Sequence, residues 1–405
     1  SFKTIRIIDK FTYSDGSGYT LNGPTGLFIR DDTIYIADKG NGRVIKCGFN
    51  GVIQRVYERP VTELLEDTAE FKPSKVVVDD VGNCYVVCEG LYQGMVNYDK
   101  DGKFVGFYGG NQVQLTFSTL AVMFWKRVLS REQARNMIRF VPVEYSNAFL
   151  LGDFVYTVTK SNTNSVDEIQ KLNPIGKNVL HFDADSANYA KNNFGDVETA
   201  YYKQTLYDSQ LVDIHVDEDG IITALDFERG RLFQYDQECN IVAVFGSRGR
   251  QKGNFLKPVA VEKYNGSYVV LDKEKRCITT FTETEYMGYV REGIRYYQQG
   301  LYEESMEPWR KVLDLNSNYQ LAYLSIGRAL YQQKDYAAAL EYFKLAQSRK
   351  DYSLAFRAYR TEVVRKYFAL IIIGFVAGIY LFVRFVRFAK KKLGVEQKKV
   401  RLVFK

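Results

Sequence analysis

Histidine is scarce in this chain of 405 residues, and its scarcity limits the chemistry that the side chains can perform. The two histidines, His181 and His215, cannot form a three-histidine metal centre. His215 lies in a strand-like segment of the kind where enzymes place ligands. A single histidine with no partner nearby in the sequence is nevertheless more typical of a buried structural residue than of a ligand.

Other chemically suggestive segments also have plainer explanations. The glycine-rich basic segment at 246–253 reads GSRGRQKG, but no Gly-Lys-Ser/Thr sequence follows it, so we predict a loop and no phosphate site. Acidic residues occur in close pairs at positions typical of turns, where we expect them to face solvent. These pairs are Asp31/Asp32, Asp79/Asp80 and Asp217/Asp219. We find no converging set of acids and histidines, and therefore predict no enzymatic activity, no metal and no cofactor.

The charge and the cysteines exclude further classes. Net charge is +7, but nine basic residues and one acid follow Lys366, which leaves 55 − 9 = 46 basic and 48 − 1 = 47 acidic residues before that point. The larger part is therefore nearly neutral, and we predict no nucleic-acid binding. Cys84 and Cys88 are the closest of the five cysteines. Four residues along a strand span about 13 Å, too far for a disulfide.

One apolar segment has the composition of a membrane span. Tyr367–Val383 contains no charged residue and would extend about 25 Å as a helix, and flanking arginines can lengthen it to position 388. A buried core helix is the alternative. Within this span, Gly374 and Gly378 form a GxxxG pattern that would let a second helix approach closely. We predict a transmembrane helix at 367–388.

Charge also predicts the orientation of this span. The basic tail at 389–405 indicates a cytoplasmic C-terminus, which would place the preceding part outside the cell. The sequence begins at Ser1, as a mature chain would after loss of a signal peptide, although a cropped sequence would look the same. A cytosolic tail-anchored protein is the alternative.

The first two thirds of the chain contain a repeated module. Copies begin at Pro24, Pro73, Leu211 and Pro258, and a more degenerate copy covers about 143–182. Each intact copy has four short strand-like segments separated by turn residues, a pattern typical of propeller blades. We predict a mainly β fold with five or six blades. The N-terminal strand Thr4–Phe11 is expected to close the ring by pairing with the last blade.

The modules share an apolar strand that ends in an acid, with an arginine five residues later or close to it. These acid–arginine pairs are Asp38/Arg43, Asp226/Arg231 and Asp272/Arg276. On these residues the module resembles the NHL repeat, which implies a ring of blades, commonly six. We expect the acids to brace turns, and a ligand role is the alternative.

A helical insertion interrupts the modules at about 115–140. Its apolar residues follow a helical period and include Leu120, Phe124 and Val128. This face would either pack over the ring or bind a partner protein.

After Val290 the sequence changes to a helical pattern with a repeat of 34 residues. The residues that recur are Gly293, Tyr297, Gln298, Gln299, Tyr302 and Glu307, matched by Gly327, Tyr331, Gln332, Gln333, Tyr336 and Glu341. The stretch resembles tetratricopeptide repeats (TPR) in this period and in its paired small and aromatic residues, which would let two helices approach closely. A half-copy at 352–365 continues into the apolar span without glycine or proline.

Two surfaces are candidates for binding. Propeller loops rich in tyrosine and amide side chains could recognise a sugar or a peptide, and they include Tyr92, Gln93, Tyr201 and Tyr202. By the TPR resemblance, the concave side of the helical repeats would form a peptide groove lined by Tyr297, Gln298, Arg328, Tyr331 and Gln332.

Taken together, the sequence predicts four parts: an NHL-like propeller at 1–288, TPR-like helices at 289–366, a membrane helix at 367–388 and a basic tail at 389–405. This order resembles bacterial surface proteins that accompany carbohydrate ABC transporters, some with a Yip1-type membrane domain. The resemblance implies a non-enzymatic accessory subunit whose partners are the lipid bilayer and the permease subunits. The alternative is an extracellular carbohydrate-binding or lactonase/lyase-like propeller.

Overall fold

A computed structural model describes most of the chain as two compact units, Ser1–Thr284 and Glu285–Lys405. The described residues are 7–63, 65, 69–110, 144–159, 168–180, 194–195, 200–202, 205–207 and 209–392. The first unit is a β-propeller of five blades, and the second is helical, as the sequence predicts. The predicted insertion at 115–140 lies outside the described residues.

The blades are antiparallel sheets numbered from the innermost strand outward. Blade 1 contains β3 (Pro24–Arg30), β4 (Thr33–Asp38), β5 (Arg43–Gly48) and β6 (Ile53–Tyr57). Blade 2 contains β7 (Pro73–Val78), β8 (Cys84–Cys88), β9 (Met95–Tyr98) and β10 (Phe104–Tyr108). Blade 3 contains β11 (Tyr145–Leu151), β12 (Phe154–Thr159) and β13 (Ile169–Leu172). Blade 4 contains β16 (Leu211–Val216), β17 (Ile222–Asp226), β18 (Arg231–Tyr235) and β19 (Ile241–Phe245). Blade 5 contains β20 (Pro258–Tyr264), β21 (Ser267–Asp272) and β22 (Cys277–Thr282).

Smaller elements complete the first unit. They are the hairpin of β1 (Phe11–Thr12) and β2 (Gly18–Tyr19), the 3-10 turn η1 (Lys39–Asn41), and the hairpin of β14 (Ala200–Tyr202) and β15 (Thr205–Tyr207).

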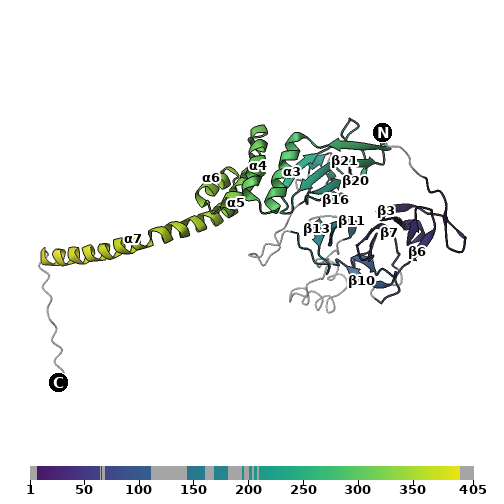
Figure 1. Ribbon diagram of the computed structural model, residues 1–405, viewed down its shortest axis with the longest axis horizontal. Helices are drawn as coiled ribbons and strands as arrows, with labels where there is room; N and C mark the ends of the chain where they lie inside the picture. The colour runs from purple at the N-terminus through teal and green to yellow at the C-terminus, as the bar shows by residue number, and fades with distance from the viewer. Residues whose placement is uncertain are drawn as a thin grey trace, which may run out of the picture. The chain divides into compact units, whose positions relative to one another are not determined.

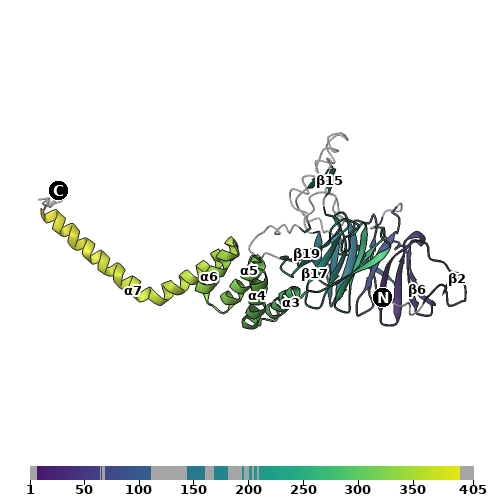
Figure 2. The ribbon, with the colours of Figure 1, turned by 90° about the horizontal axis from the view of Figure 1, so that it is seen from above.

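The innermost strands β3, β7, β11, β16 and β20 gather around a common centre (Figure 1), and Figure 2 shows the same sheets from above. Each of these strands has a register shift at the same place, so the blades are built to one plan. The core consists of apolar side chains packed between successive blades. Burial of these faces is the main stabilising contribution to the unit.

The ring does not bury its first and last blades in the same way as the others. One inner-strand position faces the preceding blade, and there Leu27 of blade 1 is 56% exposed whereas Ile214 of blade 4 is 2% exposed. Another position faces the following blade, and there Ile278 of blade 5 is 51% exposed whereas Leu232 of blade 4 is 0% exposed. In the described part of the chain, β20 and β3 also lack the close packing that joins the other neighbouring inner strands. We call this pair of half-exposed faces the open seam.

The predicted closing strand at the N-terminus is wrong for the residues that the structure describes. Residues 7–10 are irregular, and Phe11 pairs with Tyr19 within the β1–β2 hairpin. The hairpin region packs on the outer part of blade 1, where Ile8, Phe11 and Tyr19 contact a cluster centred on Ile36 and Ile45. These apolar side chains gain more burial on that sheet face than edge pairing alone would provide. Leu27 and Ile29 nevertheless stay half-exposed.

The second unit consists of helical hairpins followed by one long helix. Its helices are α3 (Glu285–Gln298), α4 (Tyr302–Leu315), α5 (Gln320–Gln332), α6 (Tyr336–Leu345) and α7 (Arg349–Lys392). The predicted close approach of paired helices is confirmed. A Cβ added at Gly293 would lie 2.7 Å from the Trp309 ring, and one at Gly327 would lie 2.8 Å from the Phe343 ring.

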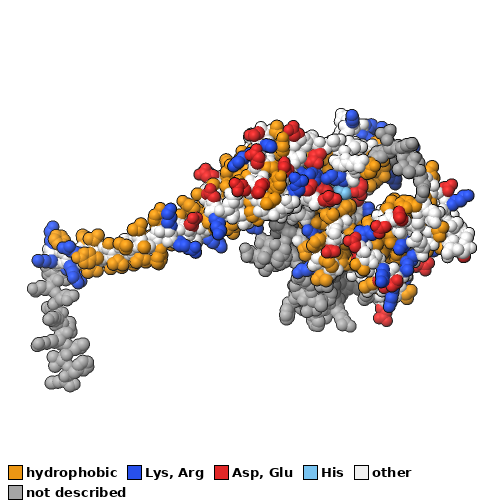
Figure 3. Space-filling view, viewed as in Figure 1, with side chains coloured by type: hydrophobic (Ala, Val, Ile, Leu, Met, Phe, Trp, Pro, Cys, Tyr) orange, Lys and Arg blue, Asp and Glu red, His pale blue; other side chains and the backbone are white. Residues whose placement is uncertain are grey.

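Helix α7 joins the repeats to the apolar span without a break. Its 44 residues begin against α6, where Ala355 is buried, and continue through the apolar segment that starts at Tyr367. That segment has no buried residue, and apolar side chains cover it in Figure 3. It is the one helix among the described residues that is long and apolar enough to cross a membrane.

Candidate functional site

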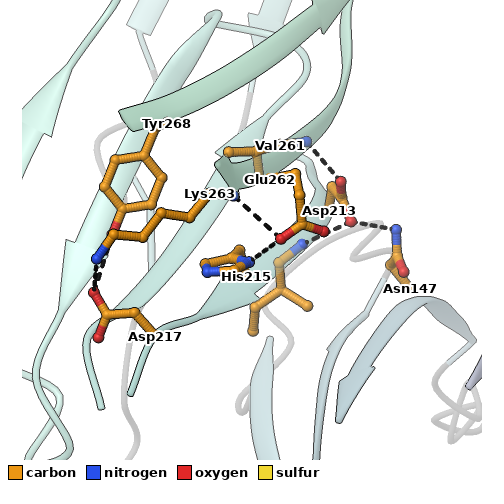
Figure 4. A network of polar contacts seen from close by, with 9 residues as sticks. Asn147, Asp213, His215, Asp217, Val261, Glu262, Lys263 and Tyr268 are labelled. Carbon is orange, nitrogen blue, oxygen red and sulfur yellow. Dashed lines mark hydrogen bonds and ion pairs between the residues drawn. The ribbon is translucent and has the colours of Figure 1, made fainter. Parts of the chain in front are cut away.

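The densest polar cluster that the structure describes in the first unit lies where the inner strands of blades 3, 4 and 5 meet. Figure 4 shows its side chains converging from β11, β16, β20 and β21. We call it the inner network, and its members are Asn147, Asp213, His215, Asp217, Glu262, Lys263 and Tyr268.

His215 contacts an acid that the sequence pattern does not reveal. Its Nδ1 lies 2.5 Å from Oε1 of Glu262 in the adjacent blade, a close ion pair when the imidazole is protonated. The imidazole is buried between two rings, with its centroid 4.7 Å from that of Phe149 and 6.1 Å from that of Tyr268. Partial burial acts to raise the pKa of Glu262, but the contact with His215 and its positive charge outweigh burial and leave the pKa below its ordinary value.

Asp217 forms a second link between the same blades. Its Oδ2 lies 3.1 Å from Nζ of Lys263 and accepts a hydrogen bond from the Tyr268 hydroxyl at 3.3 Å. The carboxyl group is buried, so the expectation that Asp217 faces solvent is wrong. The turn is where the sequence places it, but blade 5 covers its side chain.

Asp213 is the most deeply buried acid of the inner network. Its carboxylate accepts hydrogen bonds from the backbone N–H of Val261 at 2.7 Å and of Ile214 at 3.0 Å, and from Nδ2 of Asn147 at 2.5 Å. Burial raises the pKa of this carboxyl, and the nearby charge of Lys75 acts in the opposite direction. The side chain thereby connects blades 3, 4 and 5.

The inner network has the properties of an inter-blade brace. Every one of its acids contacts a protein donor or cation, and the described residues contain no cluster of histidine, cysteine and acidic side chains able to hold a metal. Blade 5 packs on blade 4 but leaves its other face half-exposed. These polar contacts therefore supplement the apolar attachment of blade 5 to the ring.

The acids of the repeated module brace turns, as predicted, but their partners are not the arginines. Asp272 accepts hydrogen bonds from four backbone N–H groups, those of Leu256, Lys257, Glu274 and Lys275. Asp226 binds the backbone in the same way. These acids fix the segment that enters each blade against the turn within it.

The predicted ligand-binding residues of the propeller do not join the inner network. Tyr92 and Gln93 are exposed in the loop between β8 and β9. Tyr201 and Tyr202 belong to β14, whose side chains are not described. Leu120, Phe124 and Val128 lie outside the described residues.

The predicted binding residues of the helical repeats fall on equivalent positions of successive hairpins. Tyr297 packs against Tyr302, and Tyr331 against Tyr336, with ring centroids 5.4 and 5.3 Å apart. Nε of Arg328 lies 3.1 Å from Oδ1 of Asp351, which ties α5 to α7. Gln298 and Gln332 are exposed at the C-terminal ends of their helices.

In the membrane helix, a Cβ at Gly374 or Gly378 would meet no atom within 4 Å. The two glycines therefore leave a shallow uncovered strip on α7.

Glu262 and Asp213 were not singled out from the sequence. A single signal was present, because both stand at inner-strand positions where other blades carry apolar or uncharged residues. Phe28, Val77 and Phe149 occupy the position of His215 and Glu262 in blades 1, 2 and 3.

Comparison with known proteins gives only distant structural matches. No family model and no curated protein match the chain. A streptogramin B lyase matches with a TM-score of 0.37 and 11% identity, over 68% of this chain and 87% of the other. The virginiamycin B lyase of Staphylococcus aureus matches with a TM-score of 0.35 and 10% identity, over 65% and 85%. The extracellular domain of a protein described as a hybrid two component system from B. thetaiotaomicron matches with a TM-score of 0.36 and 12% identity, over 68% and 30%. At these values the matches carry no inference about activity.

Proposed function

We propose that the chain is a non-enzymatic, membrane-anchored scaffold whose propeller and helical repeats bind and position a partner at the membrane surface. The observation that carries this proposal is the continuity of α7. One helix is both the last packed element of the repeats and the apolar span. No flexible joint between them is needed, so the repeats would be held at a defined height above the bilayer.

The inner network supports a scaffold more than an enzyme. Catalysis requires groups that are available to a substrate, whereas Asp213 and Asp217 are occupied by protein donors and cations. His215 is enclosed between rings and next to Glu262. The exposed Gln298 and Gln332 of the repeats are better placed to contact another protein.

The narrowest form of the proposal follows the resemblance of the domain order to surface proteins of transport systems. In that form the propeller lies outside the cell, the basic end of α7 lies in the cytoplasm, and the partners are permease subunits of a carbohydrate-uptake ABC transporter. The clustered Lys390, Lys391 and Lys392 at the end of α7 support this orientation.

The proposal is tested by photo-crosslinking of the full chain in native membranes. A photo-reactive residue replacing Gln332 should capture a defined membrane subunit that also co-purifies in mild detergent, whereas the same residue at exposed Lys103 serves as the matched control. Equal labelling from both positions, or recovery of the untreated chain in the soluble fraction, would contradict a membrane scaffold.

A second candidate is a carbohydrate-binding or lactonase/lyase-like propeller. The specific observation in its favour is the His215–Glu262 pair, since a histidine held by a carboxylate is a common proton-transfer arrangement. Calorimetry against a glycan panel and turnover assays with lactones test it. Activity that is lost on His215→Phe, in a variant with unchanged stability, would favour this candidate over the scaffold.

A further inference from the structure

A cationic groove lies beside the membrane helix, directly above the apolar span. Its volume is about 460 Å³, and it opens between the end of α5, the start of α6 and the packed part of α7. We call it the juxtamembrane groove. Its polar lining consists chiefly of Tyr331, Lys334, Tyr336, Arg357, Glu362 and Arg365.

The charge of this groove is specific to the last repeat. With the 34-residue offset, Lys334, Arg357 and Arg365 correspond to Gly300, Tyr323 and Tyr331 of the preceding repeat. Three uncharged residues are thus replaced by cations, against the single acid Glu362. The change is confined to the hairpin that adjoins the membrane helix.

Lys334 holds its place at a conformational cost. Its φ of 66° lies in the left-handed region, where the equivalent Gly300 has a φ of 78°. A glycine adopts this backbone without strain, and a lysine does not. A strained residue that also carries a charge into a groove is an observation that points to a ligand, independently of the cations on α7.

The depth of the groove identifies the source of the ligand. Arg365 precedes Tyr367 by two residues, about 3 Å along the helix axis, and Glu362 lies about 7 Å above it. Lipid headgroups occupy roughly 5–8 Å beyond the hydrocarbon core. The lower end of the groove is therefore at the depth of lipid phosphates, and Arg357 and Lys334 lie just above.

We infer that the juxtamembrane groove binds the phosphate of an anionic phospholipid headgroup. The guanidinium groups of Arg357 and Arg365 supply paired N–H donors suited to phosphate oxygens, and Lys334 adds a compact positive charge. Tyr331 and Tyr336, with ring centroids 5.3 Å apart, form a wall of the groove. This inference rests on the proposed membrane anchoring.

Lipid retention by the full chain tests the inference. Nanodiscs of phosphatidylcholine with a minor fraction of phosphatidylglycerol are extracted in mild detergent, and bound phosphatidylglycerol is counted by native mass spectrometry. We expect the Lys334→Ala, Arg357→Ala, Arg365→Ala variant to retain about ten-fold less phosphatidylglycerol. The matched control Lys344→Ala, Arg349→Ala, Arg360→Ala removes three cations that do not line the groove and should retain as much as the wild type.

Two single substitutions separate binding from folding. Lys334→Gly relieves the backbone strain, so thermal stability should stay equal or rise while lipid retention falls. Glu362→Gln removes the only acid of the groove and should raise retention.

The outcomes distinguish the inference from its premise. A chain that fails to float with the nanodiscs contradicts the membrane anchor and the groove together. A chain that floats, but whose groove and control variants retain equal phosphatidylglycerol, contradicts the groove alone. In phosphatidylcholine nanodiscs, groove-dependent protection by inorganic phosphate equal to that by phosphatidylglycerol would overturn the lipid as the source and assign a free anion.

Discussion

The residues of the inner network replace apolar contacts at one inter-blade boundary. His215 and Glu262 stand where blades 1 and 3 carry Phe28 and Phe149, so a charged pair takes the place of ring packing. A partly buried ion pair contributes less than its short distance suggests, because removing charge from water is costly. Its effect is therefore more visible in pH dependence than in total stability.

The first prediction concerns the pH dependence of unfolding. Because the pKa of Glu262 is below its ordinary value in the folded state, its contribution is present above the ordinary pKa of 4.5 and is lost as pH falls through the lower folded value. His215→Phe keeps the ring but removes the charge. Between pH 6 and pH 3, the free energy of unfolding should fall less in this variant than in the wild type.

The difference should be under about 1 kcal/mol, because the Glu262 side chain is 61% exposed and solvent screens the pair. Urea unfolding at several pH values measures it. Parallel pH profiles of the two proteins would show that the pair makes no energetic contribution.

At the scale of elements, each helical hairpin is closed by a glycine that faces an aromatic ring. Gly327 lies against the buried Phe343, and Gly293 against the buried Trp309. The glycines are expensive as helix residues but allow the close approach that buries the rings.

The second prediction is that Gly327→Ala destabilises the helical unit by about 1–2 kcal/mol. The added methyl gains helix propensity, but the Phe343 ring is fully buried and cannot yield, so overpacking dominates. Gly288→Ala is the matched control on α3, where the new Cβ would meet no atom within 4 Å, and it should be neutral or stabilising by up to about 1 kcal/mol. Thermal unfolding by circular dichroism compares the two, and a neutral Gly327→Ala would show that the hairpin can open to accept the methyl group.

Local patterns revealed these elements, and contacts distant in sequence did not. The recurrence of Gly293 and Gly327 with an aromatic residue sixteen positions later predicts the hairpins directly, because both partners lie within one repeat. The Asp217–Lys263 contact joins residues 46 positions apart in different blades. No periodicity in one sequence predicts which blades become neighbours, so the inner network stayed hidden.

The open seam was hidden for a different reason. Leu27 belongs to the same apolar strand pattern as its buried counterparts Val76 and Ile214. The sequence pattern records which face is apolar, whereas exposure depends on whether another sheet covers that face.

At the scale of the whole molecule, the third prediction concerns the membrane span. Replacing Ile372 and Val376 by lysine places two charges near the centre of the apolar segment, each costing roughly 2.5–3.5 kcal/mol on insertion. The variant should move from the membrane fraction to the soluble fraction in flotation. A matched variant with alanine at both positions should remain membrane-bound, and retention of the lysine variant in the membrane fraction would argue for a different anchor.

The fourth prediction tests the open seam by comparing equivalent positions of different blades. Ile214→Ala should cost about 2–5 kcal/mol, because the residue is buried between blades 3 and 4. Leu27→Ala occupies the same inner-strand position, but the side chain is 56% exposed, so the cost should stay under about 1 kcal/mol. Chemical denaturation of each variant measures the difference.

The comparison decides whether the five blades are the complete ring in solution. Burial of Leu27 by a further sheet would raise the cost of Leu27→Ala to that of Ile214→Ala, and would equally bury Ile278 at the opposite face. A small cost at Leu27 together with slow hydrogen exchange throughout blade 4 and faster exchange in β21 and β22 would instead follow from an open seam. Blade 5 would then depend on its single packed neighbour and on the inner network for its stability, so His215→Phe should accelerate exchange in blade 5 and leave blade 2 unchanged.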